Sequence, residues 1–350
     1  MSRASGNRVL SFGPAALLIA AVAPALPAAQ SAPAKEPPLP RILKQDPSLN
    51  NLVDPPGYAT AKLGTLGAVL KAGKGDRDMI LIPGAGFGGT VFKELMDRLA
   101  DDYRMYAVTL PGFGGTPAPP APDEKTSFGA QTWTNSALEA IEKLIADEKL
   151  HDVVVVGHWI TGTQIAVRLA NRHPETVKAV ALIAGTARIV STNEKLKELM
   201  STPEKRAKTV DTYSAPMWFK TVTRETWDDN SFIPGDYAVH PVRAQRLWRE
   251  AASPLLHVWV RYLCEFNAQD LASEVEKLRV RTLLLKPGFE DLIHPDSSAM
   301  DAYCNKSWDG LVEKSPMMTV KTIAKSRVCM WFDQPAEVQK AITEFVKQAG

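Results

Sequence analysis

The sequence alternates short, continuously apolar segments with longer segments whose apolar residues recur at helical spacing, and this rhythm constrains the fold most. Val153 to Val156 is apolar at every position, whereas the apolar residues between Thr90 and Leu99 fall on one face of a helix. Strands that are apolar throughout are buried on both faces, which is typical of a parallel sheet covered by helices on each side. The pattern therefore predicts the α/β class.

The same reading predicts the individual elements. Strands are expected at Met79–Ile82, Tyr106–Leu110, Val153–Val156, Val177–Ile183, Thr282–Lys286 and Met318–Ile323. Helices are expected at Thr90–Leu99, Trp133–Lys149, Thr161–Asn171 and Pro335–Gln348. Between residues 190 and 275 the pattern is helical and rich in tryptophan, and the strand rhythm then resumes. We therefore expect a mostly parallel sheet with helices on both faces, interrupted after its sixth strand by a helical cap.

The N-terminal residues have the pattern of a targeting segment. Arg3 and Arg8 make a positive start, Ala15 to Val22 is apolar, and small residues follow. We predict a signal peptide over residues 1–30 and a periplasmic or secreted protein. We predict that the rest of the chain divides into a Pro-rich linker (31–58), the first part of the core (59–189), the cap (190–275) and the second part of the core (276–350).

Charge and cysteine content exclude some functions. The net charge is +2, and without Arg3 and Arg8 the 41 basic residues become 39, equal to the 39 acidic ones. This balance predicts no nucleic-acid partner and no anionic membrane surface, and the apolar leader is too short for an integral membrane span. No metal-ligand spacing occurs, so neither a metal nor a cofactor is expected. Cys264, Cys304 and Cys329 allow one disulfide with a free thiol, or three buried thiols.

Five segments occur in the order and spacing of the α/β-hydrolase superfamily, which the chain resembles over roughly residues 60 to 348. These are PGAGFGGTVF after Ile82, LPGFGGTPAP after Thr109, GHWITGTQIAVRLANRHPE after Val156, KPGFEDLIHP from Lys286 and FDQPAEVQKAITEFV from Phe332. The resemblance implies the α/β-hydrolase fold with a helical cap insertion. It also implies an exported, cap-containing branch of the superfamily whose Ser-His-Asp triad is degenerate.

The glycine loop after Ile82 corresponds to the oxyanion loop of that family, so Gly84 and Ala85 are candidate oxyanion and substrate-binding residues. An alternative exists, because the glycines of this loop also match the G-x-G-x-x-G dinucleotide fingerprint. That fingerprint needs a carboxylate at the end of the next strand, and Thr109-Leu110 stand there instead. Dinucleotide binding is therefore disfavoured.

The family's G-x-S-x-G turn corresponds here to GHWITG, which starts at residue 157. One alignment puts Trp159 at the nucleophile position and the other puts Ile160 there; neither side chain can attack a carbonyl. His158 beside the turn is a candidate catalytic residue or a hydrogen-bonded strand end. Thr161 and Thr163 are the nearest hydroxyls and are expected to cap the following helix.

Of the other two positions of the family's triad, the acid position holds a carboxylate, but the base position does not hold a histidine. Asp291 stands where the resemblance places the triad carboxylate, so it is a candidate catalytic residue. The histidine position, seven residues before Pro335, holds Val328, which cannot accept a proton. Three histidines elsewhere remain candidates for reaching the cleft: His240, His257 and His294.

These observations leave three hypotheses for function. The first is a hydrolase or lyase on a small apolar ester-like or carbonyl substrate, using a non-standard site built from His158, Asp291 and a cap residue. The second is a non-catalytic member of the same fold that binds a small apolar ligand. The third is the dinucleotide enzyme. Four cap tryptophans either line an apolar site or pack the cap onto the core: Trp218, Trp227, Trp248 and Trp259.

Overall fold

Seven strands form one sheet in the order β1-β3-β2-β4-β5-β6-β7 in the computed structural model, which describes residues 64–191, 193–224, 233–289 and 297–349. The strands are β1 (Leu70–Ala72), β2 (Arg77–Ile82), β3 (Tyr103–Ala107), β4 (Val153–His158), β5 (Val177–Ile183), β6 (Arg281–Pro287) and β7 (Met318–Ile323). Only β1 is antiparallel to its neighbour. The predicted signal peptide and linker lie outside the described residues.

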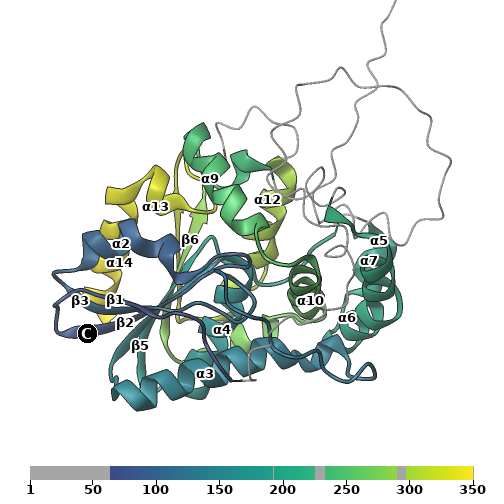
Figure 1. Ribbon diagram of the computed structural model, residues 1–350. Helices are drawn as coiled ribbons and strands as arrows, with labels where there is room; N and C mark the ends of the chain where they lie inside the picture. Colours follow the sequence, from purple (N-terminus) through teal and green to yellow (C-terminus); the bar gives the residue numbers. More distant parts are fainter. Residues whose placement is uncertain (1–63, 192, 225–232, 290–296, 350) are drawn as a thin grey trace, which may run out of the picture.

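Helices cover both faces of this sheet (Figure 1). The described helices are α2 (Lys93–Leu99), α3 (Thr132–Glu148), α4 (Trp159–Arg172), α5 (Glu194–Leu199), α6 (Pro203–Thr209), α7 (Ala215–Thr221), α9 (Pro241–Ala252), α10 (Leu256–Asn267), α11 (Ala272–Glu276), α12 (Ser297–Cys304), α13 (Met330–Asp333) and α14 (Pro335–Ala349). Helices α2 and α14 pack together on one face, and α3 and α4 pack together on the other. The predicted α/β-hydrolase fold, a mostly parallel sheet with helices on both faces, is confirmed.

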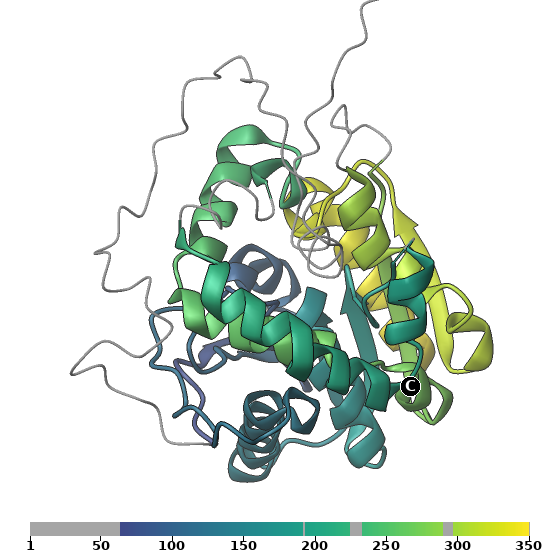
Figure 2. The ribbon, with the colours of Figure 1, turned by 90° about the vertical axis from the view of Figure 1, so that its right-hand side faces the viewer.

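Three details of the prediction are wrong. The strand expected at Tyr106–Leu110 is β3, which begins and ends earlier, at Tyr103 and Ala107. The short edge strand β1 was not predicted, because its three residues carry too little apolar pattern to stand out. The helical insertion follows the fifth of the described strands, not the sixth. Helices α5 to α7 of this insertion lie on one side of the molecule (Figure 2).

The strand order brings two distant loops together. In the sheet, β2 lies between β3 and β4. The chain passes from β2 to β3 on one side and then crosses back to β4 on the other side of β2. The loops after β2 and β4 therefore meet at the carboxyl edge of the sheet, where parallel α/β proteins bind ligands. The pairing of Ile82 with Gly157 sets this register.

Helix α10, which the sequence placed in the cap, is tied to the core helix α3. The carboxylate of Glu265 accepts hydrogen bonds from the backbone N–H groups of Trp133 and Thr134, both at 2.9 Å, and from the Thr134 hydroxyl at 2.7 Å. A carboxylate at a helix N-terminus satisfies N–H groups that have no partner within the helix. The guanidinium of Arg261 lies over the rings of Trp133 and Phe219, at 5.3 and 5.8 Å.

Cys264, Cys304 and Cys329 are all buried free thiols, so the disulfide alternative is wrong for the folded chain. Burial raises the pKa of all three thiols. Among the described residues, none of the helices has the length and apolar character needed to cross a bilayer.

Helix α4 approaches the end of β2 so closely that only glycine fits at residue 162. A Cβ atom there would lie 2.3 Å from the carbonyl oxygen of Ile82 and 3.1 Å from that of Pro83. Both obstructing atoms belong to the backbone, which cannot rotate away as a side chain can. The turn between β4 and α4 is thus held against the loop after β2 by backbone packing.

We predict that Gly162→Ala lowers the free energy of unfolding by about 3 kcal/mol or more, the upper range for overpacking a core. Denaturant unfolding followed by circular dichroism measures this change. Gly235→Ala is the matched control, because the nearest heavy atom to its new Cβ would be 4.0 Å away. Equal stability of the two variants would contradict the close approach of α4 to β2.

Candidate functional site

The turn between β4 and α4 has a strained backbone at Trp159. The strand ends at His158 and the helix begins at the next residue, with no connecting loop. Trp159 has φ 54°, the left-handed region that costs a residue with a Cβ roughly 1–2 kcal/mol. Ile160, the other residue aligned with the family's nucleophile, does not have a positive φ and is buried within the first turn of α4.

The indole of Trp159 is fully buried above this turn. Its ring meets that of Tyr237 edge to face at 5.9 Å and that of Trp259 at 6.4 Å, both residues of the insertion. It also packs on the oxyanion loop, since a Cβ on Gly84 would lie 2.9 Å from the Trp159 Cβ. The space beside Gly84 is therefore occupied by the Trp159 side chain.

The imidazole of His158 joins two other segments of the chain. Its Nδ1 accepts a hydrogen bond from the backbone N–H of Gly84 at 3.2 Å, and its Nε2 lies 3.1 Å from the carbonyl oxygen of Val328. A carbonyl only accepts and a backbone N–H only donates. The ring must therefore be neutral, with its proton on Nε2.

The surroundings of His158 keep the ring neutral. Phe87, Phe92 and Trp331 lie around it, with Trp331 edge to face at 4.9 Å. Burial lowers the pKa of His158 from its ordinary value of 6.5 to about 3, partly offset by the bond to the Val328 carbonyl. Protonating Nδ1 would also break the bond from Gly84.

Val328 lies next to this ring and is fully buried. Its N–H donates to the carbonyl of Asp236 at 3.1 Å, and the N–H of Cys329 donates to that of Tyr237 at 3.0 Å. The segment that aligns with the family's histidine is thus bonded on one side to the insertion and on the other to His158.

The two threonines near the turn do not cap α4, so that expectation is wrong. The hydroxyl of Thr161 donates to the carbonyl oxygen of Pro83 at 3.0 Å, and that of Thr163 donates to the carbonyl of Trp159 one turn earlier. Both hydroxyls are buried and engaged with backbone. The Thr161 bond joins the turn to the oxyanion loop, whereas the Thr163 bond stays within α4.

The remaining candidates are distributed as follows. Asp291 and His294 lie outside the described residues, as does Trp227. His240 is exposed at the start of α9, and His257 is buried in α10. The other cap tryptophans are all buried: Trp218, Trp248 and Trp259. Trp259 donates from Nε1 to the carbonyl oxygen of Ala251 at 2.7 Å, so its role is to pack the insertion.

The oxyanion loop is covered by the insertion. Ala85 is buried, and a Cβ on Gly86 would lie 2.5 Å from the carbonyl oxygen of Ala251 in α9. The glycines of the loop thus allow close packing against protein backbone, which argues against a bound pyrophosphate there. Within the described residues, no group of three or more His, Cys, Asp and Glu side chains is arranged to hold a metal ion.

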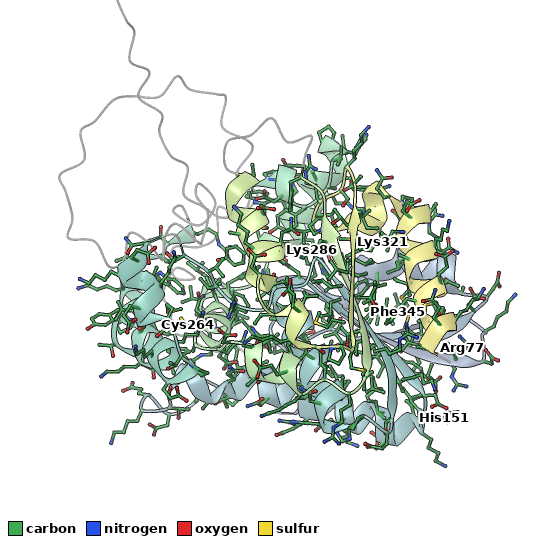
Figure 3. The ribbon with its side chains drawn as sticks, turned by 180° about the vertical axis from the view of Figure 1, so that it is seen from behind. Arg77, His151, Cys264, Lys286, Lys321 and Phe345 are labelled. Atoms are coloured by element: carbon green, nitrogen blue, oxygen red, sulfur yellow. The ribbon has the colours of Figure 1, made fainter. Side chains whose placement is uncertain are left out.

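Three cavities lie elsewhere. One of about 470 Å³ is lined by residues from α3, α4, α6 and α11, including Arg168 of α4, and by Gln131 just before α3. One of about 260 Å³ lies beside Arg206. A third, of about 230 Å³, is at the amino ends of the strands, where Arg77 and His151 lie (Figure 3). His158 and Trp159 line none of these three.

The sequence did not identify Tyr237 or Trp331 as neighbours of the turn. Tyr237, which contacts Trp159, lies in a short part of the insertion where the sequence has no helical or strand period. Trp331, which contacts His158, lies in α13. Aromatic residues in a helical insertion predict packing but not its partner. No signal in the sequence alone pairs these rings.

Curated relatives match part of the chain. A pimeloyl-[acyl-carrier protein] methyl ester esterase from Sodalis glossinidius is 30% identical over 116 residues, which are 33% of this chain and 39% of the relative. The enzyme of the same name from Chromobacterium violaceum is 34% identical over 113 residues, 32% of this chain and 39% of the relative. The chain thus matches less than half the length of these relatives.

Solved structures match more of the chain at lower identity. A thermophilic esterase from Thermogutta terrifontis has 18% identity and a TM-score of 0.57, covering 81% of this chain and 93% of the esterase. A bromoperoxidase from Bacillus anthracis also has 18% identity and a TM-score of 0.57, covering 80% of this chain and 94% of the other. At such identity these likenesses show the fold alone.

A family model described as the alpha/beta hydrolase family matches residues 79–341. This range includes most of β2, all of the strands β3 to β7 and the insertion. The loops that meet at the carboxyl edge of the sheet all lie within this match. On this match and on the seven-stranded fold, the chain belongs to the alpha/beta hydrolase family.

Proposed function

We propose that this protein is a member of the family that does not carry out acyl transfer at the β4–α4 turn and instead binds a small apolar ligand. The observation that carries the proposal is the indole of Trp159, which occupies the strained turn and packs against Gly84. Acyl transfer at this turn needs a hydroxyl, a thiol or a carboxylate there. The positive φ at Trp159 supports the alignment that puts Trp159, rather than Ile160, at the nucleophile position.

The state of His158 supports the same proposal. A histidine that acts as a general base needs a free nitrogen and a pKa near the working pH. Both nitrogens of His158 are engaged with Gly84 and Val328, and its pKa is lowered to about 3. We therefore assign His158 a structural role and withdraw it from the non-standard catalytic site.

Apolar ligand binding is supported by the aromatic rings that converge at this edge of the sheet. Trp159, Tyr237 and Trp259 come from the core and from the insertion. Aromatic side chains that come together from a core and an insertion are typical of the walls of apolar ligand sites, which supports the proposal. From Arg3, Arg8 and the apolar segment after them, we also propose that the protein acts outside the cytoplasm.

A hydrolase with an unusual site is the second candidate. It is favoured by the esterases among the relatives and by Asp291, whose sequence position matches the family's acid. This candidate predicts hydrolysis of p-nitrophenyl acetate that falls at least about a thousandfold in Asp291→Asn, the scale of losing a triad member. Equal rates in the wild type, in Asp291→Asn and in buffer would remove this candidate.

We predict that the wild type hydrolyses p-nitrophenyl acetate no faster than buffer and is not labelled by a fluorophosphonate probe. The double variant Trp159→Ser, Val328→His restores a hydroxyl at the turn and an imidazole at the family's histidine position. It should become labelled and show esterase turnover. Intact-protein mass spectrometry measures the labelling.

The single variant Trp159→Ser is the control for the double variant. It opens the same space without a base, so it should remain unlabelled or react at least about a hundredfold more slowly. Labelling of the wild type would overturn the proposal. A folded double variant that remains inert would contradict the assignment of Trp159 and Val328 to the two family positions.

The His158 ring predicts a specific pH dependence of stability. The unfolded chain takes up a proton near pH 6.5, whereas the folded chain does so only near pH 3. Stability is therefore fully present above pH 6.5 and is lost as the pH falls from there toward 3, by about 1.4 kcal/mol per pH unit. Between pH 7 and pH 5 the wild type should lose about 2 kcal/mol through this residue.

His158→Gln removes this loss, because an amide can still accept from Gly84 and donate to Val328 but does not titrate. Urea unfolding at pH 7 and pH 5 measures the difference between variant and wild type. His151→Gln is the control, since the His151 side chain is 80% exposed. If His158→Gln keeps the wild-type pH dependence, the ring titrates normally in the folded chain and its role as a base must be reconsidered.

A further inference from the structure

A cavity of about 260 Å³ lies between the loop after β5 and the helices α5 and α6. It is separate from the β4–α4 turn. Its lining combines cationic and apolar side chains with two serines. The lining residues that matter here are Arg188, Arg206, Lys197, Ile189, Leu196 and Met200.

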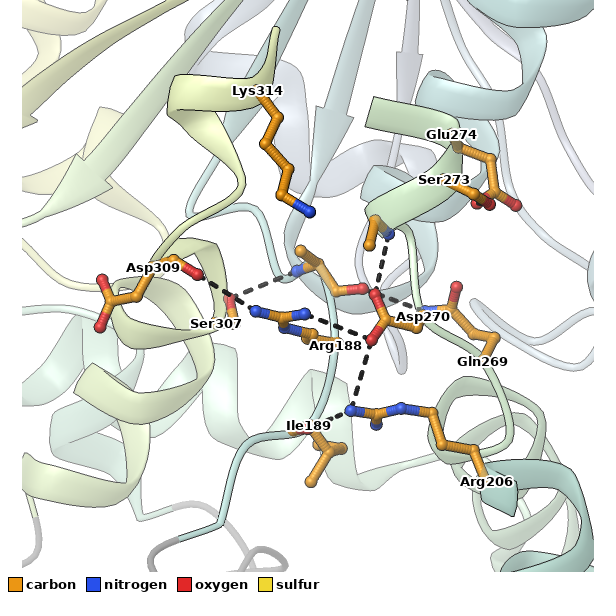
Figure 4. A network of polar contacts seen from close by, with 12 residues as sticks. Arg188, Ile189, Arg206, Gln269, Asp270, Ser273, Glu274, Ser307, Asp309 and Lys314 are labelled. Carbon is orange, nitrogen blue, oxygen red and sulfur yellow. Dashed lines mark hydrogen bonds and ion pairs between the residues drawn. The ribbon is translucent and has the colours of Figure 1, made fainter. Parts of the chain in front are cut away.

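Two of these cations share a single carboxylate. Asp270 lies between the guanidinium groups of Arg188 and Arg206, with one of its oxygens 3.4 Å from a nitrogen of each (Figure 4). The third cation, Lys197, is paired with Glu194 at 2.6 Å on α5. The pair of arginines therefore carries one positive charge that Asp270 does not neutralise.

Arg206 is held in the protein interior without enough acceptors. Its side chain is only 6% exposed. Nη2 donates to the carbonyl oxygen of Ile189 at 3.1 Å, but Nε and Nη1 have no hydrogen-bond partner within the described residues. Buried donors without an acceptor are costly, and more so when they are charged.

The group remains a cation at neutral pH. Burial and the neighbouring charge of Arg188 lower the pKa of Arg206, and Asp270 raises it, leaving it at about 10. Arg188 is also held in place, since it donates to the carbonyl oxygen of Asp309 at 3.1 Å. Two fixed guanidinium groups at one wall of a cavity form a suitable site for an oxyanion.

Another part of the lining is apolar. Three apolar side chains of the lining are buried: Leu196 in α5, Met200 at the C-terminus of α5, and Ile189 in the loop after β5. These side chains offer no partner to a second charged group. The cavity thus combines cationic and apolar side chains within one half-open space.

We propose that this cavity binds a small organic acid, with its carboxylate at Arg188 and Arg206 and its apolar body against Leu196 and Met200. A carboxylate is favoured over a phosphate monoester because one uncompensated charge matches a monoanion, whereas the phosphate carries close to two charges at neutral pH. The ligand's carboxylate would balance the positive charge that Asp270 leaves on the two guanidinium groups. This inference does not depend on whether the β4–α4 turn is catalytic.

Isothermal titration of the protein with sodium hexanoate at pH 7 tests the proposal, with acetate, 1-hexanol and inorganic phosphate as comparison ligands. Hexanoate should bind more tightly than acetate, which lacks the body, and than hexanol, which lacks the charge. Arg206→Met should weaken hexanoate binding by about tenfold or more, because a buried charged hydrogen bond is lost. Lys208→Met is the matched control, since it removes one exposed cation from the same helix and should leave binding unchanged.

Arg188→Met provides a second test, because it removes the other cation of the proposed site and its side chain is less deeply buried, at 24% exposed. It should weaken hexanoate binding several-fold. Hexanol binding as tightly as hexanoate, or phosphate binding more tightly, would overturn the assignment. Two further outcomes would overturn it: no hexanoate binding at millimolar concentration, or equal hexanoate binding in the wild type and in folded Arg206→Met and Arg188→Met.

Discussion

The imidazole of His158 is the contact on which the arrangement of this edge of the sheet depends. It bonds at once to the loop after β2, through Gly84, and to the segment before α13, through Val328. That segment is in turn bonded to residues 236–237 of the insertion. A neutral ring with one donor and one acceptor satisfies two buried backbone groups that would otherwise be unpaired. One buried side chain therefore connects three parts of the chain that are far apart in the sequence.

A ring in this position is incompatible with proton transfer. Catalytic histidines keep one nitrogen available and have a pKa close to the working pH. His158 has neither property, because the low polarity around it favours the neutral form and both nitrogens are bonded. The same features that make it a good structural link remove it from chemistry. The aromatic packing of Trp159 beside it has the same effect, since it stabilises the turn with a side chain that cannot react.

The sequence predicted the layers of the fold because their signals are local. The apolar run at β4 and the helical period of α4 are each contained in a few residues, and β5 and β7 were predicted with their exact bounds. The turn residues His158 and Trp159 were also identified, from the resemblance. What the sequence could not give is the partner of each side chain. The tautomer of His158 follows only from the positions of Gly84 and Val328, and the pairing of Arg188 with Arg206 follows only from Asp270 between them.

The left-handed backbone at Trp159 indicates what fixes the turn in this fold. In a hydrolase that conformation exposes the nucleophile, and its cost is usually attributed to catalysis. Here the conformation is kept by a tryptophan that cannot act as a nucleophile, so another cause must maintain it. Backbone packing supplies one, because Gly162 lies against the carbonyl of Ile82 and leaves no room for a wider connection between β4 and α4. The strain is then a property of the parallel sheet and of the helix α4 that follows β4, and reactive chemistry at the turn depends on the side chain alone.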